Sequence, residues 1–146
     1  MECYPDGLLV SKLGFTKKKI IHSYGKSRVL KKISKSIDSL GMVDEDPGIS
    51  NHPYEKNLRV VQEKNGLKLY TDSKGNKVIE LKEKLENWIL TVCASSNIDP
   101  RKYSLPSNPK KLHDEINYKL DKFENLIEEL LRVNNPAILQ LKSWLK

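Results

Sequence analysis

The N-terminal part of the chain alternates between helical and strand-like patterns of apolar positions. Residues 8–13 before Gly14 predict a short helix with a C-terminal glycine, and residues 19–24 predict a strand that closes on Gly25. Apolar residues recur at helical spacing from Val29 to Ile37, with lysines on the other face. The short run at residues 40–43 is typical of a buried strand. This alternation predicts parallel strands joined by right-handed crossovers.

A hairpin is predicted next. Residues 58–61 are compatible with a short strand, and two further strands, at residues 67–71 and 77–81, flank a turn. In that turn, Gly75 and Asn76 are expected to supply positive φ angles.

The second half of the chain predicts helices. Apolar residues keep helical spacing over residues 81–93, 112–131 and 138–145, and the second of these stretches predicts the longest helix. The predicted fold class is therefore α/β, with a small, mainly parallel sheet of βα units, an added hairpin and a helical C-terminal half. We expect a single domain over residues 1–146, in which residues 81–146 pack as an extension on an α/β core formed by residues 1–80.

Composition narrows the class of protein. The chain has 146 residues, of which 38% are hydrophobic and 31% charged, so it is large enough to bury a core. No apolar run approaches the roughly 20 residues that span a bilayer, and no signal-peptide pattern begins the sequence. We therefore expect a cytoplasmic protein with no membrane partner. Cys3 and Cys93 are far apart in sequence and are expected to be free thiols, Cys93 in a helix core.

Charge is distributed unevenly. The net charge is +7, and residues 7–37 carry nine basic residues and no acidic one. Such a segment is often only a solvated face, but it also suits a polyanionic partner such as DNA or RNA. Gly25, Lys26 and Ser27 follow a predicted strand and open a predicted helix, so the backbone N–H groups there, with Lys26 and Arg28, could hold a phosphate. Helix capping by Ser27 or a tight turn at Gly25 would explain the same residues.

The acidic candidates follow the predicted strand at residues 40–43. Asp44, Glu45 and Asp46 end the run before a Pro-Gly turn, and strand alternation places Asp44 and Asp46 on one side. Two converging carboxylates repel unless a proton or a cation relieves them, so a divalent metal such as Mg2+ or Mn2+ is one interpretation. A solvated acidic turn is the other.

Together, the segments Glu2-Cys3-Tyr4-Pro5-Asp6, Gly25-Lys26 and Asp44-Glu45-Asp46-Pro47-Gly48 resemble a Toprim domain, the topoisomerase-primase fold also found in OLD-family nucleases. The resemblance covers about residues 2–50. It implies that Glu2, Asp44 and Asp46 hold the metal and that Asp6 is an additional catalytic acid. Two departures are the lack of an apolar run before Glu2 and the presence of Cys3 where a glycine is common.

These observations leave more than one function open. The first hypothesis is a Mg2+-dependent phosphoryl-transfer protein, most simply a nuclease, with Glu2, Asp6, Asp44 and Asp46 in catalysis and Gly25, Lys26 and Arg28 on phosphate. The second is a non-catalytic Toprim-like module that binds nucleic acid or a partner protein, either as a homodimer or within a larger complex. The third is an α/β domain in which the lysines only confer solubility.

Overall fold

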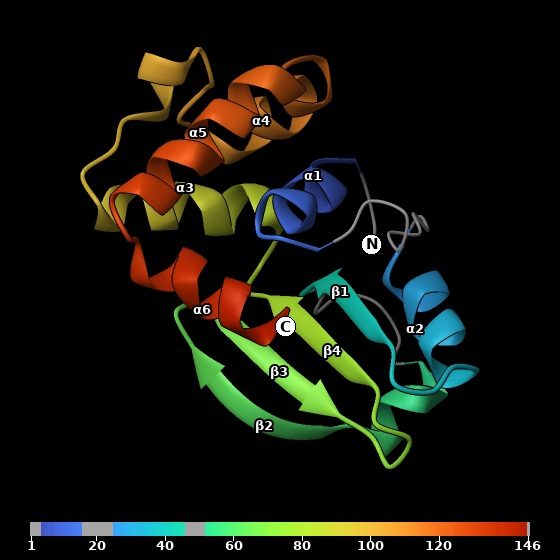
Figure 1. The fold of residues 1–146 in the computed structure, drawn as a ribbon. Coiled ribbons are helices and arrows are strands. Elements are labelled where there is room, and N and C mark those ends of the chain that lie inside the picture. The colour runs from blue at the N-terminus through green and yellow to red at the C-terminus, as the bar shows by residue number, and fades with distance from the viewer. Residues whose placement is uncertain (1–3, 16–24, 46–51, 146) are drawn as a thin grey trace.

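A four-stranded sheet lies at the centre of the fold, which the computed structural model describes for residues 4–15, 25–45 and 52–145 (Figure 1). Its strands are β1 (Leu40–Asp44), β2 (Arg59–Lys64), β3 (Leu67–Thr71) and β4 (Lys77–Leu81), in the spatial order β1-β4-β3-β2. The strands predicted from the pattern are confirmed, except that the stretch 19–24 lies outside the described residues. The α/β class is confirmed as well.

The prediction of a mainly parallel sheet is wrong, because the sheet is mixed. Only β1 and β4 pair in parallel, whereas β2 with β3 and β3 with β4 are antiparallel. The reason is the length of the connections. Short turns join β2 to β3 and β3 to β4, and a short turn can only reverse the chain, whereas a parallel neighbour requires a long crossover.

Helices occupy the rest of the described chain. The N-terminal part contains α1 (Tyr4–Lys12) and α2 (Lys26–Ser34), and a 3-10 helix, η2 (Pro53–Asn57), precedes β2. The C-terminal half contains α3 (Leu85–Ser95), η3 (Pro100–Tyr103), α4 (Pro109–Glu115), η4 (Ile116–Tyr118), α5 (Leu120–Arg132) and α6 (Pro136–Trp144). Within the described residues, no helix is both long and apolar enough to cross a membrane.

Two predicted helices break or end earlier in the structure than the pattern predicts. The helix predicted over residues 112–131 is divided, because the chain turns through η4 and Lys119 leaves the helical region at φ −133° and ψ 39°. The helix predicted to reach Ile37 ends at Ser34, and Ile37 is 71% exposed. In both cases apolar residues keep the helical period through a break in the backbone, so the pattern alone does not reveal the break.

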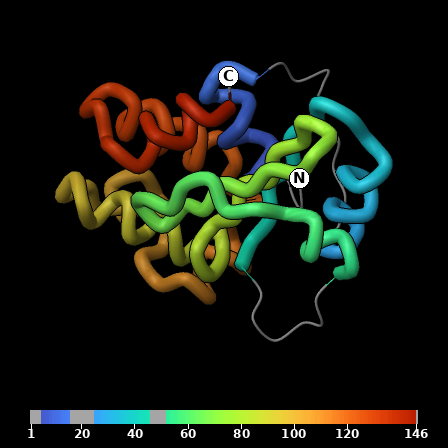
Figure 2. The backbone as a smooth tube through the Cα atoms, turned by 90° about the horizontal axis from the view of Figure 1, so that it is seen from below, coloured from blue at the N-terminus to red at the C-terminus, as the bar shows by residue number. Residues whose placement is uncertain are grey.

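The two faces of the sheet have separate cores. Met42, Ile79 and Leu81 face one side, where they pack with α1 and the C-terminal helices. Val43 and Val78 face the other, where they pack against α2 and Tyr54. Figures 1 and 2 show α2 on the β1 side of the sheet, apart from the C-terminal helices. Gly41 permits close packing of α2 on β1, since a Cβ atom there would lie 3.0 Å from Cγ1 of Ile33.

A buried hydrogen-bond network holds the turn between β3 and β4. Gly75 has the expected positive φ, at 78°, but the same expectation is wrong for Asn76. Asn76 is instead completely buried, and its Nδ2 donates to the carbonyl oxygens of Ile33 and Ser36 at the end of α2. Its Oδ1 accepts from the backbone N–H of Ser39 just before β1. One side chain therefore joins the turn, α2 and β1.

Candidate functional site

Asp44 is the last residue of β1 and lies where the carboxyl ends of the two parallel strands meet. It is in register with Leu81, the last residue of β4, and the backbone N–H of Glu45 donates to the carbonyl oxygen of Leu81 at 2.8 Å. The half-buried Asp44 carboxylate reaches α3, because its Oδ1 accepts from the backbone N–H of Leu85 at 3.1 Å. A carboxylate in that position accepts from an N–H group in the first turn of the helix, which has no partner within the helix, and interacts favourably with the positive end of the helix. The prediction that Asp44 ends a strand is confirmed.

The other predicted acids are placed differently. Glu2 and Asp46 lie outside the described residues, so their predicted roles stay predictions. Asp6 is in the first turn of α1 and is 1% exposed. Leu9 of α1 and Met42 of β1 belong to the same buried core. Asp6 is therefore on an element that shares a core with β1, but its side chain is buried.

The described residues test only part of the predicted metal site. Among them, no group of three or more His, Cys, Asp or Glu side chains is arranged to hold a metal ion. Asp44 by itself fits Mg2+, because carboxylate oxygens are the ligands that this ion prefers. A complete ligand set depends on Glu2 and Asp46, which the structure does not describe.

Lys26 lies in a cluster of ionised side chains. Its Nζ is 3.1 Å from Glu80 Oε2 and 3.2 Å from Glu55 Oε1, and the hydroxyl of Tyr70 donates to Glu80 Oε1. Burial lowers the pKa of Lys26, but the hydrogen bond and charge of Glu80, with those of Glu55, outweigh it and raise the pKa. Burial and the Glu80 charge raise the pKa of Tyr70 to about 12. Glu55 and Glu80 therefore balance the positive charge of Lys26 within the fold.

The remaining phosphate-binding candidates flank Lys26. Gly25, at φ 86°, is the N-cap of α2, and no side chain caps the helix there, so the alternative of capping by Ser27 is wrong. Arg28 is exposed. Of the three candidates, Arg28 therefore has the side chain best placed to meet a phosphate from solution. The sequence did not indicate Glu55 and Glu80 as partners of Lys26, because both are distant from it along the chain.

A second polar cluster ties η2 to the β3–β4 turn. The hydroxyl of Tyr54 donates to Asp72 Oδ2 at 2.5 Å, and the backbone N–H groups of Lys74 and Asn76 donate to Asp72 Oδ1. Burial alone would raise the pKa of Asp72, but these hydrogen bonds, that of Tyr54 first, lower it to about 2. Tyr54 therefore holds η2 against the β3–β4 turn. The sequence pattern did not reveal this role.

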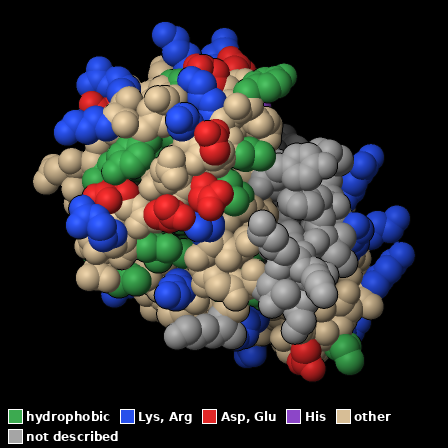
Figure 3. Space-filling view, turned by 45° about the horizontal axis from the view of Figure 1, so that its top comes forward, with side chains coloured by type: hydrophobic (Ala, Val, Ile, Leu, Met, Phe, Trp, Pro, Cys, Tyr) green, Lys and Arg blue, Asp and Glu red, His purple; other side chains and the backbone are tan. Residues whose placement is uncertain are grey.

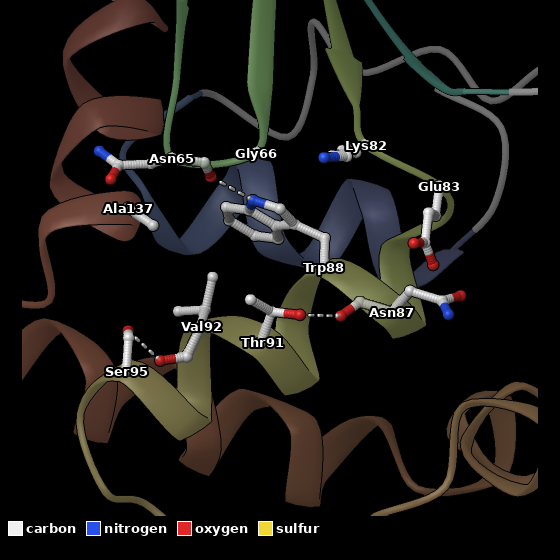
Figure 4. Close-up of a pocket in the computed structure, with 10 residues that line it drawn as sticks. All are labelled: Asn65, Gly66, Lys82, Glu83, Asn87, Trp88, Thr91, Val92, Ser95 and Ala137. Carbon is white, nitrogen blue, oxygen red and sulfur yellow. Dashed lines mark hydrogen bonds between the residues drawn. The ribbon is translucent and has the colours of Figure 1, made fainter.

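A cavity of about 280 Å3 opens at the same end of the sheet (Figure 4). Lys82 and Glu83, which follow the last residue of β4, line one side, while Asn65 and Gly66 of the β2–β3 turn line another. Trp88 lies between them, with its Nε1 donating to the carbonyl oxygen of Asn65 at 3.0 Å. Trp88 is 3% exposed, which confirms its predicted place in the core. The cavity therefore combines a mostly buried indole with charged side chains at its rim.

Comparison of the chain with protein-family models, with characterised proteins and with solved structures gave no match. The Toprim resemblance therefore rests on the short motifs around Glu2, Lys26 and Asp44 and stays a hypothesis.

Proposed function

We propose that this protein is a Toprim-like, Mg2+-dependent phosphoryl-transfer protein that acts on nucleic acid, most simply as a nuclease. The observation that carries the proposal is the position of Asp44 at the carboxyl end of the parallel pair β1 and β4, next to the beginning of α3. In open α/β sheets, ligands bind outside the carboxyl ends of the strands. The net charge of +7 favours a polyanionic substrate.

In this proposal, Asp44 would hold Mg2+ or Mn2+ together with Glu2 and Asp46, which are assigned from the sequence alone. The ion would polarise the phosphate group that reacts. Asp44 also has a structural role, because its carboxylate accepts a hydrogen bond from the backbone N–H of Leu85 at the start of α3. Asp6 is buried, so it would act by orienting another group rather than by touching the substrate.

The second candidate, a module that binds nucleic acid without cleaving it, is favoured by a different observation. Two of the described side chains that the resemblance singles out have structural partners that the fold supplies. Asp44 bonds to the N-terminus of α3, and Lys26 pairs with Glu55 and Glu80. These contacts give both residues a role in the fold that does not depend on catalysis, so their presence alone does not require an enzyme.

Cleavage assays in the presence and absence of metal separate the two candidates. We expect the purified protein to cleave end-labelled single- or double-stranded DNA or RNA in Mg2+. Cleavage should stop when EDTA is added, because the ion stabilises the charge on the reacting phosphate group. The matched control is heat-denatured protein from the same preparation, which should be inactive in both buffers. Binding that persists in EDTA without any cleavage in Mg2+ or Mn2+ would favour the non-catalytic module instead.

A further inference from the structure

The exposed face of α2 carries basic side chains and no acidic one. Arg28, Lys31 and Lys32 on the helix and Lys35 at its C-cap are all exposed, whereas Val29, Leu30 and Ile33 are buried against the sheet. At 100° per residue, the four basic residues fall within an arc of about 100°. Lys26 falls outside this arc, on the inward side where it meets Glu55 and Glu80.

The β3–β4 turn adds a fifth cation to this face. Lys74 is exposed, and its Nζ donates to the carbonyl oxygen of Ser34 in the last turn of α2 at 3.1 Å. A lysine at that position also interacts favourably with the negative end of the helix. The α2 basic face is therefore formed by two segments of the chain, and it consists of Arg28, Lys31, Lys32, Lys35 and Lys74.

From this arrangement we infer that the α2 basic face binds the sugar-phosphate backbone of nucleic acid. From Arg28 to Lys35 the helix rises about 10 Å, which matches about three base-pair steps at 3.4 Å each. No acidic residue lies on α2 itself, although the exposed Asp38 lies beside Lys74, since its backbone N–H donates to the Lys74 carbonyl oxygen at 3.2 Å. Exposed lysines and arginines can each neutralise a phosphate and release its counterion. Figure 3 shows several basic side chains projecting at the edge where α2 lies, with an acidic side chain at the lower end of that edge, while the C-terminal helices display both signs of charge throughout.

The direction of α2 connects this face to the candidate metal site. Lys26, at the first turn of α2, reaches Glu80, which is in register with Val43 near the carboxyl end of β1. Ser36, just beyond the other end of the helix, is bonded to Asn76 near the beginning of β1. A backbone that follows α2 toward Arg28 therefore approaches the end of the sheet that carries Asp44. This inference deepens the proposed function, since it names the surface that would hold the substrate.

The test compares two matched double variants by fluorescence anisotropy with a labelled 20-base-pair DNA duplex in EDTA. Lys31→Ala/Lys32→Ala removes two cations from the α2 basic face, and the control Lys110→Ala/Lys111→Ala removes two exposed, adjacent lysines from α4. Both variants lose the same charge and place alanine, a strong helix former, in a helix. We expect the α2 variant to bind at least about tenfold more weakly and to reduce the salt slope of log K by about 2. The α4 control should change much less.

Equal losses in the two variants would overturn the inference, because they would show that total charge, rather than this face, determines binding. Unchanged binding in the α2 variant would also overturn it. So would a wild-type protein that binds anionic lipid vesicles but binds neither DNA nor RNA. The measurement is made without metal, so it is independent of catalysis. Weaker binding by the α2 variant, together with no cleavage by the wild-type protein in Mg2+, would support DNA binding by the α2 basic face and reject the nuclease.

Discussion

The Asp44→Asn variant is expected to lose metal-dependent cleavage by at least about 100-fold while keeping nearly the stability of the wild-type protein. Asparagine removes the negative charge that would bind Mg2+, and a metal ion contributes several kcal/mol of charge stabilisation, at tenfold in rate for each 1.36 kcal/mol. Asparagine still has an Oδ1 that can accept the hydrogen bond from the backbone N–H of Leu85.

The Asp44→Ala variant provides the structural comparison. Alanine removes both the charge and the hydrogen bond to Leu85, so we expect the same loss of cleavage together with a decrease of about 1 kcal/mol in the free energy of unfolding. Cleavage rates and urea denaturation of the two variants, measured on the same preparations, separate the catalytic role from the structural role. If Asp44→Asn cleaved at the wild-type rate, Asp44 would not be a metal ligand.

The Asn76→Ala variant is expected to lower the free energy of unfolding by about 2–4 kcal/mol. Its amide donates to the carbonyl oxygens of Ile33 and Ser36 and accepts from the backbone N–H of Ser39, all in or next to the buried interior. Alanine would leave these backbone groups without their partner, and each unsatisfied buried group is costly. The same change removes a donor to Asp72, whose carboxylate depends on such hydrogen bonds.

Urea denaturation of Asn76→Ala and of the control Asn125→Ala measures this effect. Asn125 is exposed on α5, so its replacement should change the free energy of unfolding by less than about 0.5 kcal/mol. A loss below about 1 kcal/mol in Asn76→Ala would contradict the assignment of Asn76 as the side chain that joins the turn, α2 and β1.

Much of the fold could be predicted from periodicity. The short apolar run ending at Asp44 forms β1, the hairpin of β3 and β4 is present, and Cys93 is buried in α3 as expected. These features depend on local spacing of apolar residues, which a sequence displays directly. The mixed character of the sheet was not predicted, because strand direction depends on which strands become neighbours and on how the chain connects them.

In the candidate site, only features that depend on a single segment of the chain could be predicted from the sequence. The place of Asp44 at a strand end follows from the residues around it. Its hydrogen bond to Leu85 joins residues 41 positions apart, and the ion pair of Lys26 with Glu80 joins residues 54 positions apart. Such contacts depend on the tertiary fold, and no local spacing encodes them. This is also why Asn76, which looked like a turn residue, proved to be a buried connector.

Thermal denaturation across a Mg2+ titration, with wild-type protein and Asp44→Asn side by side, tests the central claim most directly. An ion that binds only the folded state raises the midpoint temperature as its concentration exceeds the dissociation constant. The account predicts that the midpoint of the wild-type protein rises with Mg2+ and that the variant needs far more Mg2+ for the same rise. No response in the wild-type protein, or equal responses in both, would contradict a metal site at Asp44.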